Sequence, residues 1–339
     1  MFLEFFGFRE QPFGVTPDPR FLYLSPGHRE ALASLYYGIE SGRGFMALIA
    51  KPGMGKTTLL FHLLERFRNS ARTAFLFQTQ CNSREFMRLL LAELGVESYD
   101  QDFVRMHENF NKLLLQEARA NRQFVVVIDE AQNLDASVME TVRLLSDFET
   151  PRAKLLQIIL SGQPELADKL ASPQLLQLKQ RVSLLNRLAP FSPQETRKYI
   201  EHRLTVAGYS GPFPFSDEAM AAIVCFSAGI PRNINNFCFN LLSLGCALRQ
   251  REIDLKMVEE VSNDLDISQQ VTEIPPPPLD PRSLHVPARG NFAAVHDTAT
   301  NAASVPLTPA KAREYISELA VQLRDWKREL GVREGTHSL

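Results

Sequence analysis

The chain has 339 residues and a formal net charge of −2, and 45% of its residues are hydrophobic and 22% charged. These values are typical of a globular protein with room for a large domain and a smaller one. The pI near 6.4 argues against a chain that binds nucleic acid through its overall charge, although a local basic patch is compatible with it.

Several features point to the cytoplasm. The sequence has no apolar run of about 18 residues that would cross a membrane. The apolar N-terminus has neither a basic segment nor a small-residue cleavage site, so we predict no signal peptide. The cysteines lack zinc-ligand spacing and are expected to be buried free thiols: Cys81, Cys225, Cys238 and Cys246.

Residues 1–30 are rich in aromatic residues and prolines, and we expect an extended lead-in whose rings pack on the domain behind it. These rings would either fill a core or close over an adenine base, and the sequence leaves both interpretations open. Ser25 is a suitable N-cap for a helix that continues to Ile39.

Residues 50–58 have the layout of a phosphate-binding P-loop. An apolar strand, 45–49, enters the loop, and an apolar helical run, 59–64, leaves it. Backbone N–H groups in such a loop surround an anion, and the helix that follows adds the positive end of its dipole. The residues predicted to bind a nucleotide here are Ala50, Lys51, Pro52, Gly53, Met54, Gly55, Lys56, Thr57 and Thr58.

Two side chains of this loop have distinct predicted roles. Lys56 would contact the β- and γ-phosphates, and the Thr57 hydroxyl would ligate Mg²⁺. The usual pattern begins with glycine, which tolerates a positive φ, whereas this chain has Ala50. We therefore expect a loop that binds phosphate but is less relaxed. The alternative is a glycine-rich turn that binds no ligand.

A second motif follows at the end of a buried strand. The intervening sequence predicts a strand over 73–77 and helices over 83–94 and 105–120. The apolar run 124–128 then ends in Asp129 and Glu130, at the sheet edge where α/β proteins bind ligands. Asp129 is predicted to hold Mg²⁺. Glu130, on the opposite side of the strand, is predicted to orient or deprotonate the attacking water.

Two more strands carry polar candidates. A strand over 155–161, predicted to lie between the P-loop strand and the acidic strand, ends near Ser161 and Gln163, and either side chain could sense a γ-phosphate. The alternative is an ordinary polar strand end. Arg181 precedes a last strand, 183–188, and could face the γ-phosphate bound to a neighbouring subunit. Composition alone favours a solvated arginine there.

After Pro190 the pattern becomes helical. Helix starts are predicted near Ser192, Ser216, Gly229 and Asp254, which makes a small helical domain. Arg232, at one of these starts, either contacts the phosphates across the inter-domain cleft or is a surface arginine.

The C-terminal region differs in composition. Residues 268–310 contain a run of prolines and predict a disordered linker. Residues 311–331 predict an amphipathic helix, which would dock on a partner, on another subunit or on the chain itself. Its basic residues leave binding to a membrane surface open, although the acidic residues among them weaken that alternative. Its apolar residues at heptad-like spacing are Ala312, Ile316, Leu319, Leu323, Trp326 and Leu330.

Residues 1–267 resemble the AAA+ ATPases related to component A of the general (type II) secretion pathway. The motifs that carry the resemblance are residues 5–8, 11–13, 17–23, 28–32, 129–134, 162–166 and 180–182. The resemblance implies a five-stranded parallel sheet in the order 5-1-4-3-2, flanked by helices and followed by a helical lid. It also implies a sensor 1 at Ser161 or Gln163, an arginine finger at Arg181 and a sensor 2 at Arg232.

Relatives in that family serve envelope export, pilus and polysaccharide systems and, more distantly, transposition. Secretion component A proteins typically continue into a membrane span and a cell-wall-binding domain, and this sequence has neither, so we do not expect direct engagement of the cell wall. We predict an α/β nucleotide-binding domain at 1–190 and a helical lid at 191–267. A linker at 268–310 and a terminal helix at 311–331 follow.

The sequence therefore predicts an oligomeric, Mg²⁺-dependent ATPase that drives or regulates assembly of an envelope export system. It would lie in the cytoplasm, or at the inner membrane through a protein partner. A DNA-associated regulator and a nucleotide-gated scaffold that hardly turns over are the alternatives. The acidic pI and the lack of a recognisable DNA-binding domain argue against the first, and Glu130 argues against the second.

Overall fold

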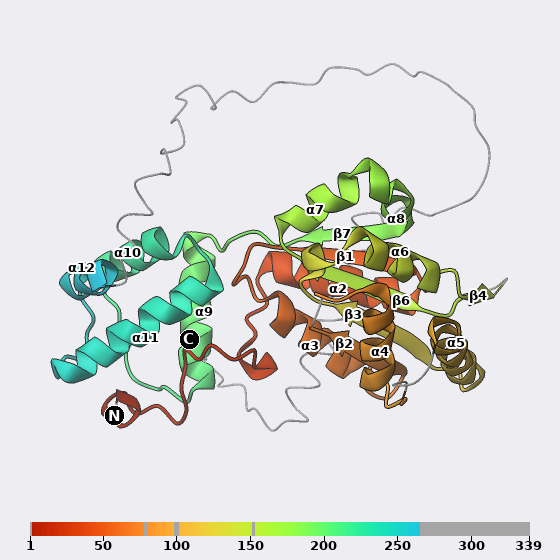
Figure 1. The fold of residues 1–339 in the computed structure, drawn as a ribbon. Helices are drawn as coiled ribbons and strands as arrows, with labels where there is room; N and C mark the ends of the chain where they lie inside the picture. Colours follow the sequence, from red (N-terminus) through yellow and green to blue (C-terminus); the bar gives the residue numbers. More distant parts are fainter. Residues whose placement is uncertain (1, 78–79, 98–101, 151–152, 265–339) are drawn as a thin grey trace, which may run out of the picture. The chain divides into compact units, whose positions relative to one another are not determined.

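The computed structural model describes residues 2–77, 80–97, 102–150 and 153–264 (Figure 1). They belong to one compact unit, Met1–Leu265. The predicted linker and terminal helix, 268–310 and 311–331, lie outside the described residues and stay predictions. The boundary expected near residue 190 also stays a prediction.

A parallel sheet forms the centre of the nucleotide-binding region. Its strands are β1 (Phe45–Ile49), β2 (Ala71–Leu76), β3 (Gln123–Ile128), β6 (Gln157–Gly162) and β7 (Val182–Arg187). They lie in the order β2-β3-β6-β1-β7, and every neighbouring pair is parallel. When the five strands are numbered 1 to 5 along the chain and read from the β7 edge of the sheet, their order is 5-1-4-3-2. This confirms the predicted order.

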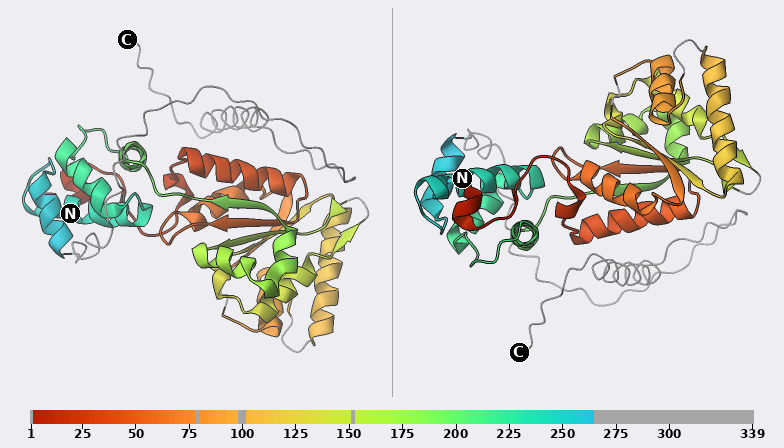
Figure 2. Two further views of the ribbon diagram at one scale, coloured as in Figure 1. Left: turned by 90° about the horizontal axis from the view of Figure 1, so that it is seen from above. Right: turned by 90° about the horizontal axis from the view of Figure 1, so that it is seen from below.

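Side chains alternate between two cores, one on each face of the sheet, as strand geometry requires. On one face, Met46 and Leu48 of β1 pack with the helices α2 (Pro26–Glu40) and α3 (Lys56–Arg66). On the other, Phe45 and Ile49 pack with a second set of helices. This set comprises α4 (Ser83–Glu93), α5 (Phe103–Arg119), α6 (Ala136–Leu145), α7 (Pro164–Ala171) and α8 (Leu176–Arg181). Figure 2 shows helices on both sides of the sheet.

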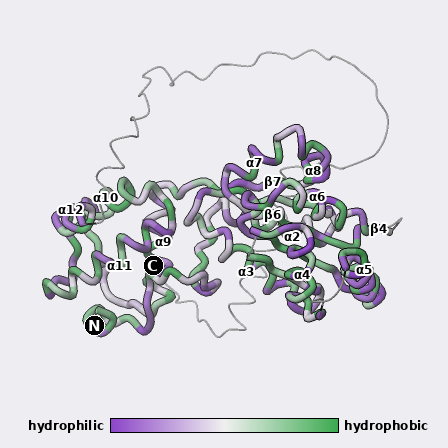
Figure 3. The backbone as a smooth tube through the Cα atoms, viewed as in Figure 1, coloured by the Kyte–Doolittle hydropathy of each residue, from purple (hydrophilic) through white to green (hydrophobic). Residues whose placement is uncertain are grey.

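The flanking helices are amphipathic. In α5, the buried residues Met106, Phe110, Leu114 and Glu117 recur at helical spacing and face the core. Figure 3 shows hydrophilic and hydrophobic residues interspersed along this helix. The sequence analysis did not predict α6, α7 and α8, which have 10, 8 and 6 residues and are therefore too short for a clear periodic pattern.

After residue 190 the described chain is almost entirely helical, as predicted. The helices are α9 (Pro193–Val206), α10 (Asp217–Ser227), α11 (Pro231–Ala247) and α12 (Leu255–Asp264). Ser192 caps α9 in a capping box with Glu195, and Ser216 caps α10. The short strands β4 (Glu149–Thr150) and β5 (Ala153–Lys154) pair as an antiparallel ribbon elsewhere in the chain.

The lead-in is less extended than expected. It contains a helix α1 (Phe2–Phe6) and a 3-10 turn η1 (Pro19–Phe21). A five-residue helix is unstable alone, but here Phe6 is buried and Phe2 contacts Phe239 of α11 edge to face. Tertiary packing thus stabilises a helix that local propensity does not predict.

Candidate functional site

The P-loop leaves β1 and opens α3 in a glycine-dependent conformation. Gly53 and Gly55 have φ values of +79° and +83°, in the left-handed region that other residues rarely adopt. Ala50 lies outside that region. Its N–H extends the sheet by donating to the Gly162 carbonyl at 3.0 Å, and its methyl group is buried. The strain expected from alanine at this position is therefore absent.

Lys56 is held inside the loop. Its side chain is buried, and its Nζ donates to the Ala50 carbonyl oxygen at 3.2 Å. Burial lowers the pKa of Lys56, and the carboxylates of Glu130 and Asp129 oppose this effect. A buried ammonium with one carbonyl partner is stabilised by a second partner that carries negative charge. The environment of Lys56 therefore favours binding of a phosphate.

Asp129 connects the two predicted nucleotide motifs. The Thr57 hydroxyl donates to Asp129 Oδ2 at 2.7 Å, and the Ser161 hydroxyl donates to Oδ1 at 2.7 Å. Because Ser161 is fully buried and directed at Asp129, it fixes the carboxylate rather than facing the pocket. The hydroxyl of Thr57 and the carboxylate of Asp129 are hard oxygen ligands that fit a Mg²⁺ ion with its remaining waters.

Glu130 does not lie on the strand, because β3 ends at Ile128. Its φ of 51° turns the chain into a short 3-10 segment, η2 (Ala131–Asn133). The expected placement by strand alternation was therefore wrong. Glu130 instead lines the pocket, where its Oε2 accepts hydrogen bonds from Gln132 Nε2 at 2.6 Å and Gln163 Nε2 at 3.0 Å.

These contacts determine the charge of Glu130. Burial by itself raises the pKa of the carboxyl group. The amides of Gln163 and Gln132, together with the charges of Lys56 and Arg232, outweigh burial and bring the pKa below its usual value. Glu130 is therefore an ionised acceptor at neutral pH.

A buried histidine supports the loop from α2. The His28 ring accepts from the Ser25 hydroxyl at Nδ1 (2.9 Å) and donates from Nε2 to the Met54 carbonyl (3.1 Å). Burial lowers the pKa of His28, which favours this neutral ring. His28 thereby anchors the turn between the two positive-φ glycines.

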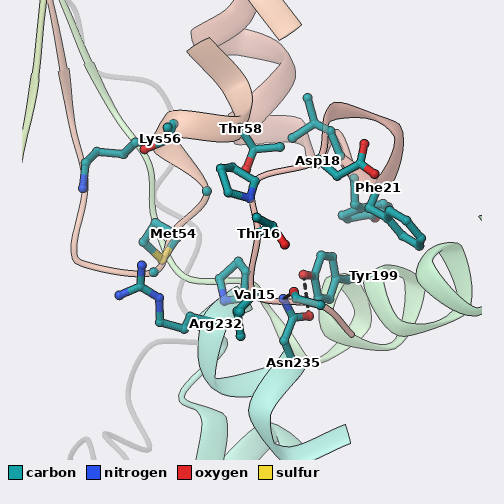
Figure 4. A pocket seen from close by; sticks show the side chains of 18 of the residues that line it. Val15, Thr16, Asp18, Phe21, Met54, Lys56, Thr58, Tyr199, Arg232 and Asn235 are labelled. Carbon is teal, nitrogen blue, oxygen red and sulfur yellow. Dashed lines mark hydrogen bonds between the residues drawn. The ribbon is translucent and has the colours of Figure 1, made fainter. Parts of the chain in front are cut away.

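Arg232 meets the loop from the helical region. Its backbone N–H donates to the Gly53 carbonyl at 3.1 Å, and its side chain lines the pocket with Lys56 (Figure 4). A Cβ atom on Gly53 would lie 2.6 Å from the Arg232 Cβ. The helical region thus contacts the loop at the position predicted for sensor 2.

The lead-in and the helices α9 and α11 form the rest of the pocket wall. Tyr199 donates from its hydroxyl to Asn235 Oδ1 at 2.8 Å (Figure 4). Arg203 Nη1 donates to the Tyr199 oxygen at 2.9 Å. Arg203 also donates to the Pro12 carbonyl and stacks over Phe21 at 4.8 Å. Part of the lead-in therefore fills a core with its rings, while residues 14–18 and 21–23 line the pocket.

The pocket has a volume of about 300 Å³, which suits a small-molecule ligand. Thr57, Thr58, Gln163 and the loop residues from Pro52 to Lys56 line it. Lys51, in contrast, is an exposed residue of the loop that does not line the pocket.

Arg181 lies at the end of α8, away from the pocket lining. Its Nη1 donates to Ser146 Oγ at 2.6 Å and pairs with Asp147. Within one chain, therefore, the structure brings the loop, Asp129, Glu130, Gln163 and Arg232 together and leaves Arg181 apart from them.

The described residues contain no cluster of His, Cys, Asp and Glu side chains that would by itself hold a metal. Within the same residues, no helix combines the length and apolarity needed to span a bilayer.

The sequence analysis missed Gln132, His28, Tyr199, Arg203 and Asn235. Gln132 follows Glu130 closely, and a polar residue beside a candidate base was a usable signal. The other four act through contacts between distant segments, such as Arg203 with Pro12, which no local pattern reveals.

Comparison with known proteins identifies a matching family and two relatives of this chain. Residues 39–170 match the family described as AAA domain. General secretion pathway protein A of Aeromonas hydrophila is 38% identical over 240 residues, which cover 70% of this chain and 44% of that protein. An uncharacterized HTH-type transcriptional regulator of Methanocaldococcus jannaschii is 28% identical over 170 residues, covering 48% of this chain and 40% of the relative. The chain thus spans less than half of each curated relative.

Solved structures share the fold. Cdc6p from Pyrobaculum aerophilum has a TM-score of 0.57 at 16% identity, covering 72% of this chain and 70% of that chain. The Aeropyrum pernix ORC2 protein has a TM-score of 0.58 at 16% identity, and the match covers 75% of this chain and 71% of that protein. At such low identity the similarity establishes the architecture alone.

Proposed function

We propose that this chain, an AAA+ P-loop protein related to general secretion pathway protein A, binds and hydrolyses ATP with Mg²⁺ at the pocket described above. One observation carries the proposal. Thr57 and Ser161 both donate to Asp129, and the adjacent Glu130 lines the pocket beside Lys56. A hydroxyl–carboxylate pair and a neighbouring ionised glutamate are what phosphoryl transfer to water requires.

The residues divide this work. Backbone N–H groups of residues 53–58, together with Lys56 and Arg232, bind and orient the phosphates. Thr57 and Asp129 would hold the Mg²⁺ ion, which neutralises charge on the phosphate oxygens when bound. Glu130 orients the attacking water and accepts its proton. Gln163, which lines the pocket, is the better candidate for sensor 1, and Ser161 positions Asp129.

Two variants of the full chain test the activity. Lys56→Ala should lose ATP binding, measured by calorimetry, because the loop loses its buried cation. Glu130→Gln should bind ATP with near-native affinity and lose phosphate release by at least about 100-fold. A Glu130→Gln protein that hydrolyses ATP at the native rate would refute the assignment of the base.

We place the activity in an oligomer that powers or regulates assembly of a cell-envelope secretion or polysaccharide-export system. The similarity to a protein named for the general secretion pathway supports this role. The chain would act in the cytoplasm or at the inner membrane through a protein partner, with residues 311–331 as the docking segment. Purification from cells with and without 311–331 should show loss of an export-system component from the shorter chain. Identical co-purifying proteins would contradict this docking role.

A DNA-associated regulator is the second candidate. The relative named as an HTH-type transcriptional regulator favours it. It predicts binding to duplex DNA that weakens steeply as salt rises. Titration of labelled duplex at two salt concentrations separates the candidates, since an export ATPase should show no such binding.

A further inference from the structure

Gln132 occupies a central position in a ring of hydrogen bonds. Its Nε2 donates to Glu130 Oε2 at 2.6 Å, and its Oε1 accepts from the backbone N–H of Gln163 at 3.1 Å. The Gln163 side chain closes the ring by donating to the same Glu130 oxygen at 3.0 Å. The base and the polar residue at the end of β6 are therefore connected through one amide.

The orientation of this amide is determined by its partners. A backbone N–H can only donate, so the atom facing Gln163 must be the acceptor Oε1. The other end must then present its N–H group to the carboxylate of Glu130. A reversed amide would place two donors face to face and two acceptors face to face.

The surroundings of Gln132 are built to hold it. Lys169 donates from Nζ to the Gln132 carbonyl at 2.9 Å and also to the Leu134 carbonyl. A Cβ atom on Gly162 would approach Gln132 Oε1 to 2.7 Å, so glycine at the end of β6 leaves room for the amide. Hydrogen bonds thus fix both the backbone and the side chain of Gln132, and Gly162 leaves room for its amide.

We propose that Gln132 is a positioning residue that aims the Glu130 carboxylate and couples its orientation to Gln163. This inference rests on the proposed role of Glu130 as the base. Because Gln132 does not line the pocket, its substitution should affect turnover rather than nucleotide binding. A displacement of Gln163 by ligand would be transmitted to Glu130 through the ring.

Two variants of the full chain test the proposal. Gln132→Leu removes both hydrogen bonds at similar volume, and kcat should fall roughly 10-fold or more while the ATP dissociation constant stays within about threefold. Gln132→Glu keeps the side-chain volume but replaces the Nε2 donor with an oxygen that faces the Glu130 carboxylate. It should therefore also lower kcat roughly 10-fold or more, while the ATP dissociation constant stays within about threefold.

Asn133→Ala is the matched control, because Asn133 is exposed in the same 3-10 turn and should keep native kinetics. Native kcat for Gln132→Leu or for Gln132→Glu would overturn the proposal. If Gln132→Leu does not fold, the kcat and the ATP dissociation constant of Gln132→Glu decide. A Glu130→Gln protein with native turnover would instead refute the proposed base, so the two failures are distinguishable.

A double substitution gives an independent readout. If the ring acts as a unit, Gln132→Leu combined with Gln163→Ala should lower kcat no further than the worse single change. Losses that multiply would mean that the two amides act separately, which would overturn the coupling.

Discussion

The backbone N–H of Arg232 donates to the carbonyl oxygen of Gly53 at 3.1 Å, which joins the first turn of α11 to the P-loop. Gly53 permits this approach for two reasons. Its φ is +79°, and an added Cβ would lie 2.6 Å from the Arg232 Cβ. The loop glycine thus serves both the local turn and the contact with the helical region.

Gly53→Ala should therefore damage nucleotide binding more than its conformational strain alone explains. We expect a loss of about 1–2 kcal/mol in unfolding free energy from the positive φ, and at least a 10-fold weaker affinity for ATP from the displaced Arg232. Gly95→Ala is the matched control, since Gly95 has a φ of +74° with open space around its Cβ position. Equal ATP affinities for the two variants, measured by calorimetry, would contradict this interpretation.

Ala50→Gly should not raise the rate of the proposed ATP hydrolysis, although glycine is usual at this position. Ala50 has no positive φ to relieve and its methyl group is buried against the core. The substitution should cost about 1–2 kcal/mol in unfolding free energy, through a lost methyl contact and a more flexible unfolded chain. Denaturant melts and steady-state phosphate release would check this, and faster turnover without loss of stability would refute it.

The sequence predicted the architecture well because its signals are local. Strand β1 was predicted with its observed ends, and the apolar run 124–128 lies within β3, since a strand buried on both faces needs an uninterrupted apolar run. The order of the strands came from the family resemblance and is confirmed. The lead-in helix α1 was missed because its stability depends on contacts with α11, far along the chain.

The site was predictable only in part. The P-loop, Asp129 and Glu130 are encoded in short motifs, but the conformation of Glu130 is not. Glu130 lies beyond the end of β3 at Ile128, and its left-handed φ turns the side chain toward Gln163, which the alternation of side chains along a strand does not predict. The choice between Ser161 and Gln163 likewise required knowing which of them bonds Asp129.

His62 should make stability depend on pH below neutrality. Burial on α3, and then the charge of Arg66, lower its pKa from 6.5 to about 4. The unfolded chain therefore binds more protons between these values, and the free energy of unfolding falls as pH drops from 6.5 toward 4. The contribution is roughly 3 kcal/mol across this window.

His62→Gln removes this titration and isolates its effect from that of the other groups. Denaturant melts at pH 7 and pH 4.5 should show a smaller difference in unfolding free energy for the variant than for the native chain. An equal difference in both proteins would mean that His62 does not titrate with a lowered pKa.

Mixing of subunits tests whether Arg181 completes a neighbour's site. Arg181→Ala and Glu130→Gln proteins should each be inactive alone if the site is shared. When they co-assemble at equal amounts, about one quarter of sites pair an intact Glu130 with an intact neighbouring Arg181, so activity should return to about that fraction. Arg187→Ala is the control, because this exposed arginine lies at the other end of β7 and should remain active alone.

The intramolecular contacts of Arg181 sharpen this test. Arg181 pairs with Asp147 and Ser146 of its own chain, so Arg181→Ala could act by destabilising α6 rather than by emptying a neighbour's site. A destabilised subunit would stay inactive in mixtures, whereas a subunit that lacks only the finger is rescued, because its own Glu130 is intact. Failure of rescue in assemblies shown by mass to contain both variants would therefore assign Arg181 to its own fold.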